Sequence, residues 1–468
     1  MESLSSEQFV SSYESEQMIT CIQQIDIEEY GSKKWLEQHK IIDTLNMQAH
    51  RNAAQKTEEY VMQGLSDANK VKDLIYILLV SEAWKKNLYP LVKKKVSHSH
   101  SLKGYLLLYH EATLINIIEI IFFHLTAVLS SGDSIIELIE YCYRKTMKLE
   151  NDFEEKGQVY LEDEDIKDTS DYSEEKELDK HFQKIEISIQ FISLAAICCI
   201  VDHVKDLPLS VIHQLCENTD FLMLLVRILD HKPWVSKNSK GERLVYEDQK
   251  WKKVENKDFM KVTKLEAQLW LSVYSLFLTK NCADYYQLTN SRKDNMLKLR
   301  KYLNETLIDQ IPILANLLKV LEQLSITEVP SISNKSIFMV QQIPEFKNKI
   351  YSNKNWKEIA EYQIKHYFNQ SKEEMKEELD KIVSLYDNHL IEEMMEDPRC
   401  GNCGKPSTLR CSRCKHEWYC SVDCQKTKWK DHKPLCDIFS DQVNKSKSES
   451  NTIKPKEEVK KQLIVELD

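Results

Sequence analysis

Eight residues of the types that bind zinc recur at short, fixed spacings between residues 400 and 436. They include seven of the chain's 13 cysteines, and they are Cys400, Cys403, Cys411, Cys414, Cys420, Cys424, His432 and Cys436. Eight donors are enough for two tetrahedral sites of four sulfur or nitrogen ligands each. Because four protein ligands leave no position for water or substrate, we expect two structural Zn²⁺ ions that hold a segment too short for its own core.

The residues around these ligands are typical of a surface that binds a peptide. Ser421 can cap a short helix, on which Gln425 and Trp429 stand four residues apart on one face. An exposed indole beside an amide suits an extended, proline-containing peptide, since the ring offers apolar area and the amide bonds to peptide backbone. The alternative is that Trp429 packs with Trp418 in the interior of the small domain.

The order of the ligands, with Tyr419, Gln425 and Trp429 among them, resembles the MYND family of zinc fingers. A RING finger would need another ligand order, and the HIT finger is the closer rival. The resemblance implies an interleaved pairing, with Cys400, Cys403, Cys420 and Cys424 on one zinc and Cys411, Cys414, His432 and Cys436 on the other. It also implies a peptide groove formed by Ser412, Gln425 and Trp429.

The charge of the chain argues against nucleic acid as a partner. Residues 400–436 carry eight basic and three acidic side chains, and the thiolates and zinc ions reduce this surplus to about +2. The whole chain has 64 basic and 74 acidic residues, a net charge of −10, which opposes binding to phosphates.

The residues before the finger are predicted to form an all-α body over 1–395. Only 8 glycines and 10 prolines occur in 468 residues, which leaves few residues for tight turns between strands. Apolar residues repeat at three and four from Val262 to Leu278, and residues 107–129 read as one buried helix. The short segments 209–216 and 220–229 suggest an armadillo-like stack of helix pairs. No apolar run is long enough for a membrane span.

Three polar segments interrupt or follow this pattern. Residues 150–180 hold 14 acidic and four basic side chains and are predicted to be a disordered loop. Residues 236–257 and the polar tail 437–468 are predicted to be disordered or loosely attached. The acidic start of the chain has no signal-peptide core, which favours a cytoplasmic protein with reduced thiols.

Enzymatic chemistry is not predicted. MYND fingers also occur in lysine methyltransferases, but those enzymes use glycine-containing loops and an Asn-His motif for their cofactor. This chain has no GxG sequence and no phosphate-binding GxxxxGK[ST] sequence. We therefore expect no catalytic residues.

The body itself resembles the MYND-finger proteins required for the assembly of axonemal dynein arms. The matching strings include Trp35, residues 38–39, 45–49, 84–90, 110–112, 122–124, 141–145, 231–234, 264–278, 297–314 and 342–345. The resemblance implies a non-enzymatic scaffold or co-chaperone adaptor in the cytoplasm, near the centrosome, the centriolar satellites or the ciliary base.

The partners that this resemblance implies are a leucine-rich-repeat assembly factor at the C-terminal region, heat-shock chaperones with their co-chaperones, and dynein intermediate or heavy chains. The alternative function is a transcriptional co-repressor adaptor, because MYND fingers of nuclear proteins bind proline-containing peptides. The short run Lys93 to Lys95 is not a clear nuclear-import signal.

Overall fold

The structure, a computed structural model, describes residues 9–98, 101–160, 174–255, 258–328 and 343–369 ahead of the finger. Within the finger it describes residues 400–403, 405, 407, 409–414, 417–430, 432–433 and 436. The chain divides into two compact units, of which residues 1–162 and 179–364 form the helical body. Residues 163–178 and 365–468, including the finger, form the second unit. The predicted end of the body at residue 395 and the predicted tail 437–468 lie outside the described residues.

The prediction of a helical chain with a small finger is confirmed. The first helices are α1 (Ser12–Thr20), η1 (Ile27–Glu29), α2 (Lys33–Gln55), α3 (Tyr60–Asp67), α4 (Val71–Asn87), α5 (Tyr89–His98), α6 (Ser101–Ile121), α7 (Leu125–Ser130), α8 (Ser134–Lys156) and α9 (Glu174–Asp202). The later ones are α10 (Leu209–His213), η3 (Gln214–Asn218), α11 (Phe221–His231), α12 (Lys264–Leu278), α13 (Lys280–Tyr285), α14 (Asn290–Lys298), η5 (Leu299–Lys301), α15 (Glu305–Gln310), α16 (Leu314–Ile326), α17 (Glu345–Tyr351) and α18 (Trp356–His366).

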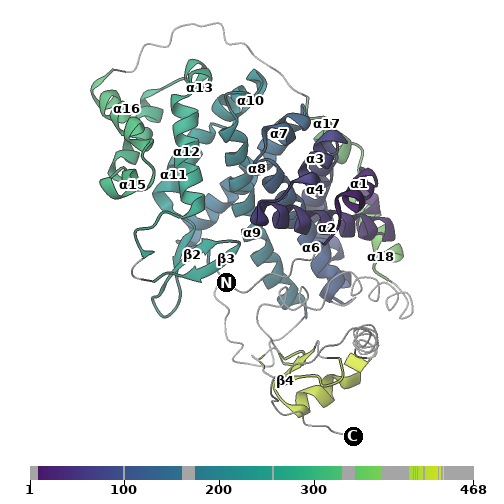
Figure 1. Ribbon diagram of the computed structural model, residues 1–468. Helices are drawn as coiled ribbons and strands as arrows, with labels where there is room; N and C mark the ends of the chain where they lie inside the picture. Colours follow the sequence, from purple (N-terminus) through teal and green to yellow (C-terminus); the bar gives the residue numbers. More distant parts are fainter. Residues whose placement is uncertain are drawn as a thin grey trace, which may run out of the picture. The chain divides into compact units, whose positions relative to one another are not determined.

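Helices of the body mostly pack on helices one to four places away in the chain (Figure 1). Helix α6 packs on α2 and α4, α8 packs on α4 and α11, and α12 packs on α11 and α16. The chain then returns to its N-terminal helices, where α17 packs on α4. Gln363 of α18 accepts a hydrogen bond from Trp84 Nε1 at 3.0 Å and donates to the carbonyl of Ile27 at 2.8 Å, which fixes this return in the core.

One predicted helix is confirmed and another is shorter than predicted. Helix α12 begins after Thr263, whose hydroxyl caps it by accepting the N–H of Glu266 at 3.1 Å. The helix predicted over 107–129 ends at Ile121, and α7 begins only at Leu125. His124 between them is extended, with its Nε2 at 2.8 Å from a carboxylate oxygen of Glu59. The apolar run is therefore divided into two helices, with His124 in extended conformation between them.

A buried network of charges joins four helices of the body. Lys85 of α4 contacts Glu111 of α6 and Glu186 of α9, each at 2.8 Å. Lys145 of α8 lies 2.7 Å from Glu111 and 3.4 Å from Glu186, and Tyr141 donates to Glu111 at 2.7 Å. Burial opposes the charge on Glu111, but Lys145 and Lys85 hold the pKa of that carboxyl below its ordinary value of 4.5. The network therefore stays ionised inside the core.

The segment 236–257, predicted to be loosely attached, instead contributes to an antiparallel sheet. Strands β1 (Val235–Lys237), β2 (Arg243–Glu247) and β3 (Lys250–Lys253) pair in chain order. Tyr246 anchors the sheet on α9, because its ring stacks on Phe191 at 4.2 Å and its hydroxyl lies 2.8 Å from that of Ser188. That prediction is wrong, because the three central residues of β2, Leu244, Val245 and Tyr246, are apolar and all buried.

The prediction of a disordered loop over 150–180 is also wrong at both ends of that segment. Helix α8 continues to Lys156, and α9 begins at Glu174. Glu150 is fully buried, where its carboxylate meets His231 at 2.7 Å. Residues 161–173, at the centre of the acidic segment, lie outside the described residues.

Within the part of the chain that the structure describes, two helices are long and apolar enough to cross a membrane by length and composition, over Lys103–Ile121 of α6 and Leu178–Asp202 of α9. In these spans 72% and 78% of the most apolar window is buried inside the protein. Such burial is what core helices of a folded domain show, so the two spans are weak indications of a membrane segment.

Candidate metal centre

Two backbone loops and a short strand pair present the first ligands of the finger. Strand β4 (Leu409–Arg410) pairs antiparallel with β5 (Trp418–Tyr419). The amide of Cys400 donates to the carbonyl of Lys405 at 2.8 Å, and the amide of Cys411 donates to that of Glu417 at 2.8 Å. These bonds close a tight loop after each leading cysteine, so both sulfurs of each CxxC pair can face the same centre.

The first cluster consists of Cys400, Cys403, Cys420 and Cys424. Its sulfurs lie 3.4 Å apart for Cys403 and Cys420, 3.5 Å for Cys420 and Cys424, and 3.8 Å for Cys424 and Cys403. Ligands about 2.3 Å from a tetrahedral zinc stand roughly 3.8 Å apart, whereas disulfide sulfurs are only about 2.0 Å apart. The spacing therefore fits four thiolates around one zinc ion.

The second cluster consists of Cys411, Cys414, His432 and Cys436. The sulfurs of Cys411 and Cys436 are 3.8 Å apart, and Cys414 Sγ is 3.6 Å from His432 Nε2. In each cluster all four donor atoms lie within 4.8 Å of one another. The ligands alternate along the chain between the two clusters, which is the interleaved pairing that the resemblance implied.

This donor chemistry fits two structural zinc ions. Thiolate and imidazole ligands favour Zn²⁺, and each set supplies all four positions of a tetrahedron. When bound, the ions would cross-link distant parts of a segment that has only a small apolar core. The chain's own part is to hold the donors in place: Ser421 caps the helix over 422–430 by accepting the amide of Cys424 at 3.2 Å, as predicted.

The aromatic residues of the finger form a small core around these ligands. Tyr419 is buried and meets the His432 ring edge-to-face at 5.8 Å. Trp429 is half-buried, packs on the ligand cluster, and lies 5.6 Å from the same imidazole. Trp418 stands apart, with the guanidinium of Arg410 4.2 Å from its ring centre. Part of Trp429 therefore belongs to the interior, although its partner there is His432 rather than Trp418.

The three residues predicted to line a peptide groove have different surroundings. Ser412 is exposed, whereas Gln425 and Trp429 are half-buried. Gln425 Nε2 donates to Cys411 Sγ at 3.7 Å, so this amide touches a ligand of the second cluster while its neighbour Cys424 belongs to the first. The spacing of residues along the chain does not predict this contact. A hydrogen bond from a residue that is not itself a ligand stabilises a thiolate. Peptide binding by the three residues stays a prediction.

The comparisons with known proteins agree with this geometry. Residues 400–436 match the MYND finger family. The chain is 26% identical over 457 residues to the zinc finger MYND domain-containing protein 10 homolog of Drosophila melanogaster, which covers 92% of this chain and 99% of that protein. No solved structure is matched significantly.

Other relatives share only a small part of the chain. The mouse Tudor domain-containing protein 1 is 38% identical over 65 residues, 13% of this chain and 6% of that protein. The Arabidopsis thaliana ubiquitin carboxyl-terminal hydrolase 19 is 44% identical over 54 residues, 11% of this chain and 8% of that protein. From their ligand geometry and their family match, residues 400–436 form a MYND zinc finger, and the chain is similar along most of its length to the Drosophila zinc finger MYND domain-containing protein 10 homolog.

Proposed function

We propose that this chain is a non-enzymatic cytoplasmic adaptor for the preassembly of axonemal dynein arms in cells that build motile cilia. The observation that carries the proposal is a likeness to the Drosophila relative over 92% of this chain. This likeness includes the helical body, whose sequence resembles dynein-arm assembly factors. The Tudor-domain protein and the hydrolase, in contrast, cover only 13% and 11% of the chain.

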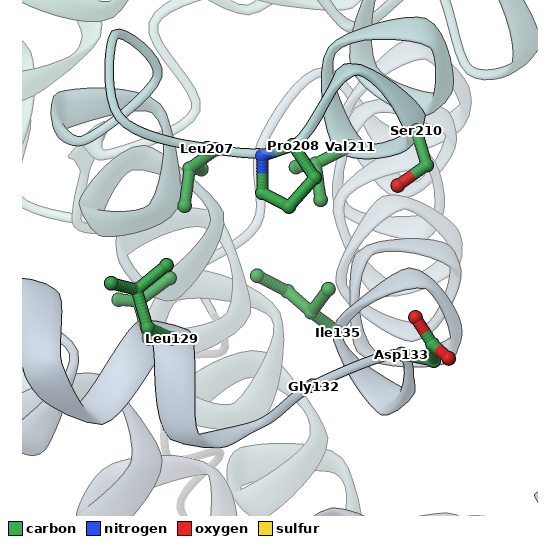
Figure 2. A pocket seen from close by; sticks show the side chains of 9 residues that line it. Leu129, Gly132, Asp133, Ile135, Leu207, Pro208, Ser210 and Val211 are labelled. Carbon is green, nitrogen blue, oxygen red and sulfur yellow. The ribbon is translucent and has the colours of Figure 1, made fainter.

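The chemistry of the metal sites supports a role in binding rather than in catalysis. Each cluster supplies four protein ligands, which leaves zinc no position at which to activate water. Separately from the metal sites, residues of α7, α8 and α10 with the loops beside them line a small pocket of about 130 Å³. Figure 2 shows apolar side chains such as Leu129, Ile135 and Val211 around it, with Asp133 and Ser210 to one side.

The finger and the body offer two kinds of surface to partners. A zinc-held finger presents a rigid face without needing a large core, and a stack of helices offers extended surfaces. We assign the leucine-rich-repeat assembly factor to the finger. Heat-shock chaperones, co-chaperones and dynein intermediate or heavy chains would then meet the complex through the body or through that factor.

Affinity capture from cells that are building motile cilia tests this function. The tagged chain should capture a leucine-rich-repeat protein together with chaperones and dynein chains, and it should remain outside the nucleus. Trp429→Ala and Val422→Ala form a matched pair of variants on the finger helix. The first removes a side chain of the candidate peptide-binding face, and the second removes the exposed side chain of Val422 as a control. Nuclear accumulation with capture of co-repressor proteins would instead support the transcriptional adaptor and overturn the proposal.

A further inference from the structure

Three side chains outside the finger come together where α8 meets the end of α11. Glu150 and Glu154 lie one helical turn apart on α8, and His231 is the last residue of α11. One donor atom from each lies within 4.8 Å of the other two. Among the described residues, and leaving the finger aside, no other group of three or more such donors is this close.

The contact between Glu150 and His231 does not satisfy the buried carboxylate. Glu150 is fully buried, and its Oε1 lies 2.7 Å from His231 Nδ1. Its second oxygen, Oε2, is buried without a hydrogen-bond partner in the described part of the chain. A buried carboxylate oxygen without a partner is costly, and a second carboxylate nearby adds repulsion. One oxygen of the Glu150 carboxylate is therefore available to bind a cation.

Neighbouring cationic side chains contact other groups. Arg227 attracts Glu150 from a distance, but its Nη2 lies 3.4 Å from Met147 Sδ. Lys232, next to His231, places its Nζ 2.7 Å from Glu266. When both are ionised, the two carboxylates of the cluster carry a charge of −2, which one divalent metal ion would balance.

The geometry also allows an ion to enter and bind. The His231 ring is stacked on Phe153, with centroids 5.3 Å apart and an angle of 23° between the planes, so its orientation is fixed. The imidazole is one-third exposed and Glu154 is exposed, which opens the cluster to solvent. Glu154 supplies a donor oxygen within 4.8 Å of the other two donor atoms, and zinc binds carboxylates at roughly 2.0–2.2 Å.

We propose that Glu150, Glu154 and His231 bind a third divalent metal ion, of which Zn²⁺ is the best fit. One imidazole nitrogen and two carboxylate oxygens are accepted zinc ligands, and water would complete the coordination. The ion would join α8 to the end of α11 and so fix two helices of the stack. Hard oxygen donors and an open position make this site weaker than the thiolate clusters, and the proposal goes beyond the function as an adaptor.

Zinc titration of the full chain tests the site. The protein is first dialysed against a weak chelator until elemental analysis gives only the two finger ions per chain. Calorimetric titration with zinc chloride should then show one further equivalent for the wild type. Glu154→Gln should weaken this step at least about tenfold, whereas Glu155→Gln should leave it unchanged, because Glu155 is the adjacent exposed glutamate and is not in the cluster.

A second pair of variants separates loss of a ligand from loss of folding. His231→Gln should lose the third equivalent and keep the two finger ions, and His213→Gln on α10 should keep all three. Exposed Glu154 makes no packing contribution that its glutamine variant would lose, so that variant should melt at the wild-type temperature without added zinc. Saturation of the wild type at two ions, or equal third-site binding by Glu154→Gln and Glu155→Gln, would overturn the proposal.

Discussion

The finger and the helical body reach stable structures by opposite means. In the finger, the core consists mainly of metal ligands, with Tyr419 fully buried among them and Trp429 partly so. In the body, most residues of helices such as α4 and α6 are buried, and a network of ionised side chains lies at the centre with side-chain exposures of 9% or less. The comparison teaches that removing the metal should unfold the finger and leave the body folded. Removing one buried charge should lower the stability of the body and leave the finger unchanged.

The largest effect is expected for Cys403→Ala, which removes one thiolate of the first cluster. Structural zinc contributes about 10–16 kcal/mol per site in finger peptides, more than so short a segment can replace. After dialysis against a competing chelator, elemental analysis should find two zinc ions in the wild type and fewer in the variant. Circular dichroism should show nearly unchanged helix content. A variant that retains both ions would contradict this interpretation of the finger.

A smaller effect is expected in the body for Lys145→Met. Loss of one partner leaves carboxylates buried with less compensation, which costs about 3–5 kcal/mol in comparable networks. The neighbouring Arg144→Met is the matched control, because that side chain is 44% exposed and pairs with Glu82. The control should cost about 1 kcal/mol or less in urea unfolding followed by tryptophan fluorescence. Equal losses for the two variants would show that the network does not stabilise the core.

Trp429→Ala addresses the face of the finger rather than its metals. Truncating an aromatic anchor in a binding groove often costs about 2 kcal/mol, a roughly thirtyfold loss of affinity. Titration with the leucine-rich-repeat assembly factor that we propose as a partner should show this loss while both zinc ions remain bound. If affinity is unchanged and zinc is retained, the docking site lies elsewhere, and the helices before the finger become the better candidates.

The smallest effect is expected for deletion of residues 161–173. This segment is rich in acidic residues and offers little apolar surface to bury, so its removal should leave the unfolding midpoint nearly unchanged. Deleting the whole of 150–180 should instead reduce the yield of folded protein, because it removes buried Glu150 and parts of α8 and α9. Equal behaviour of the two deletions would show that the ends of the acidic segment do not support the core.

The finger could be predicted because its information is local. All eight ligands fall between residues 400 and 436, and each CxxC pair brings two sulfurs to one centre. The hydrogen bond of Gln425 to Cys411 depends on how the helix over 422–430 is turned toward the other cluster, which spacing does not determine. The contact of Gln425 with the metal ligand Cys411 was therefore not predictable, although Gln425 itself was predicted for peptide binding.

The missed sheet has a different physical cause. A scarcity of glycine argued against hairpins, but Asp248 and Gln249 both adopt positive φ angles, 51° and 61°, in the turn between β2 and β3. At the other turn, Asn238 Oδ1 accepts the amides of Lys240 and Glu242. Gly241 takes a positive φ of 76° in that turn, whereas the turn between β2 and β3 forms without glycine, so composition alone underestimated the strands.

Buried charges were unpredictable for a third reason, which is distance along the chain. Glu150 lies in an acidic stretch that reads as solvated, and its partner His231 is 81 residues away. Glu111 and Lys145 likewise meet only when α6 and α8 pack beside α4. A sequence pattern reports which face of a helix is apolar, but it does not report which polar residues the fold will pair.

Hydrogen exchange measured by mass spectrometry, before and after zinc is removed with a strong chelator, tests the central claim most directly. We predict that amides in 400–436 lose nearly all protection on zinc removal, while those of α4 and α6 in the body exchange at unchanged rates. Loss of protection in α4 and α6 together with the finger, or a finger that stays protected without metal, would contradict the account of two independently stabilised regions.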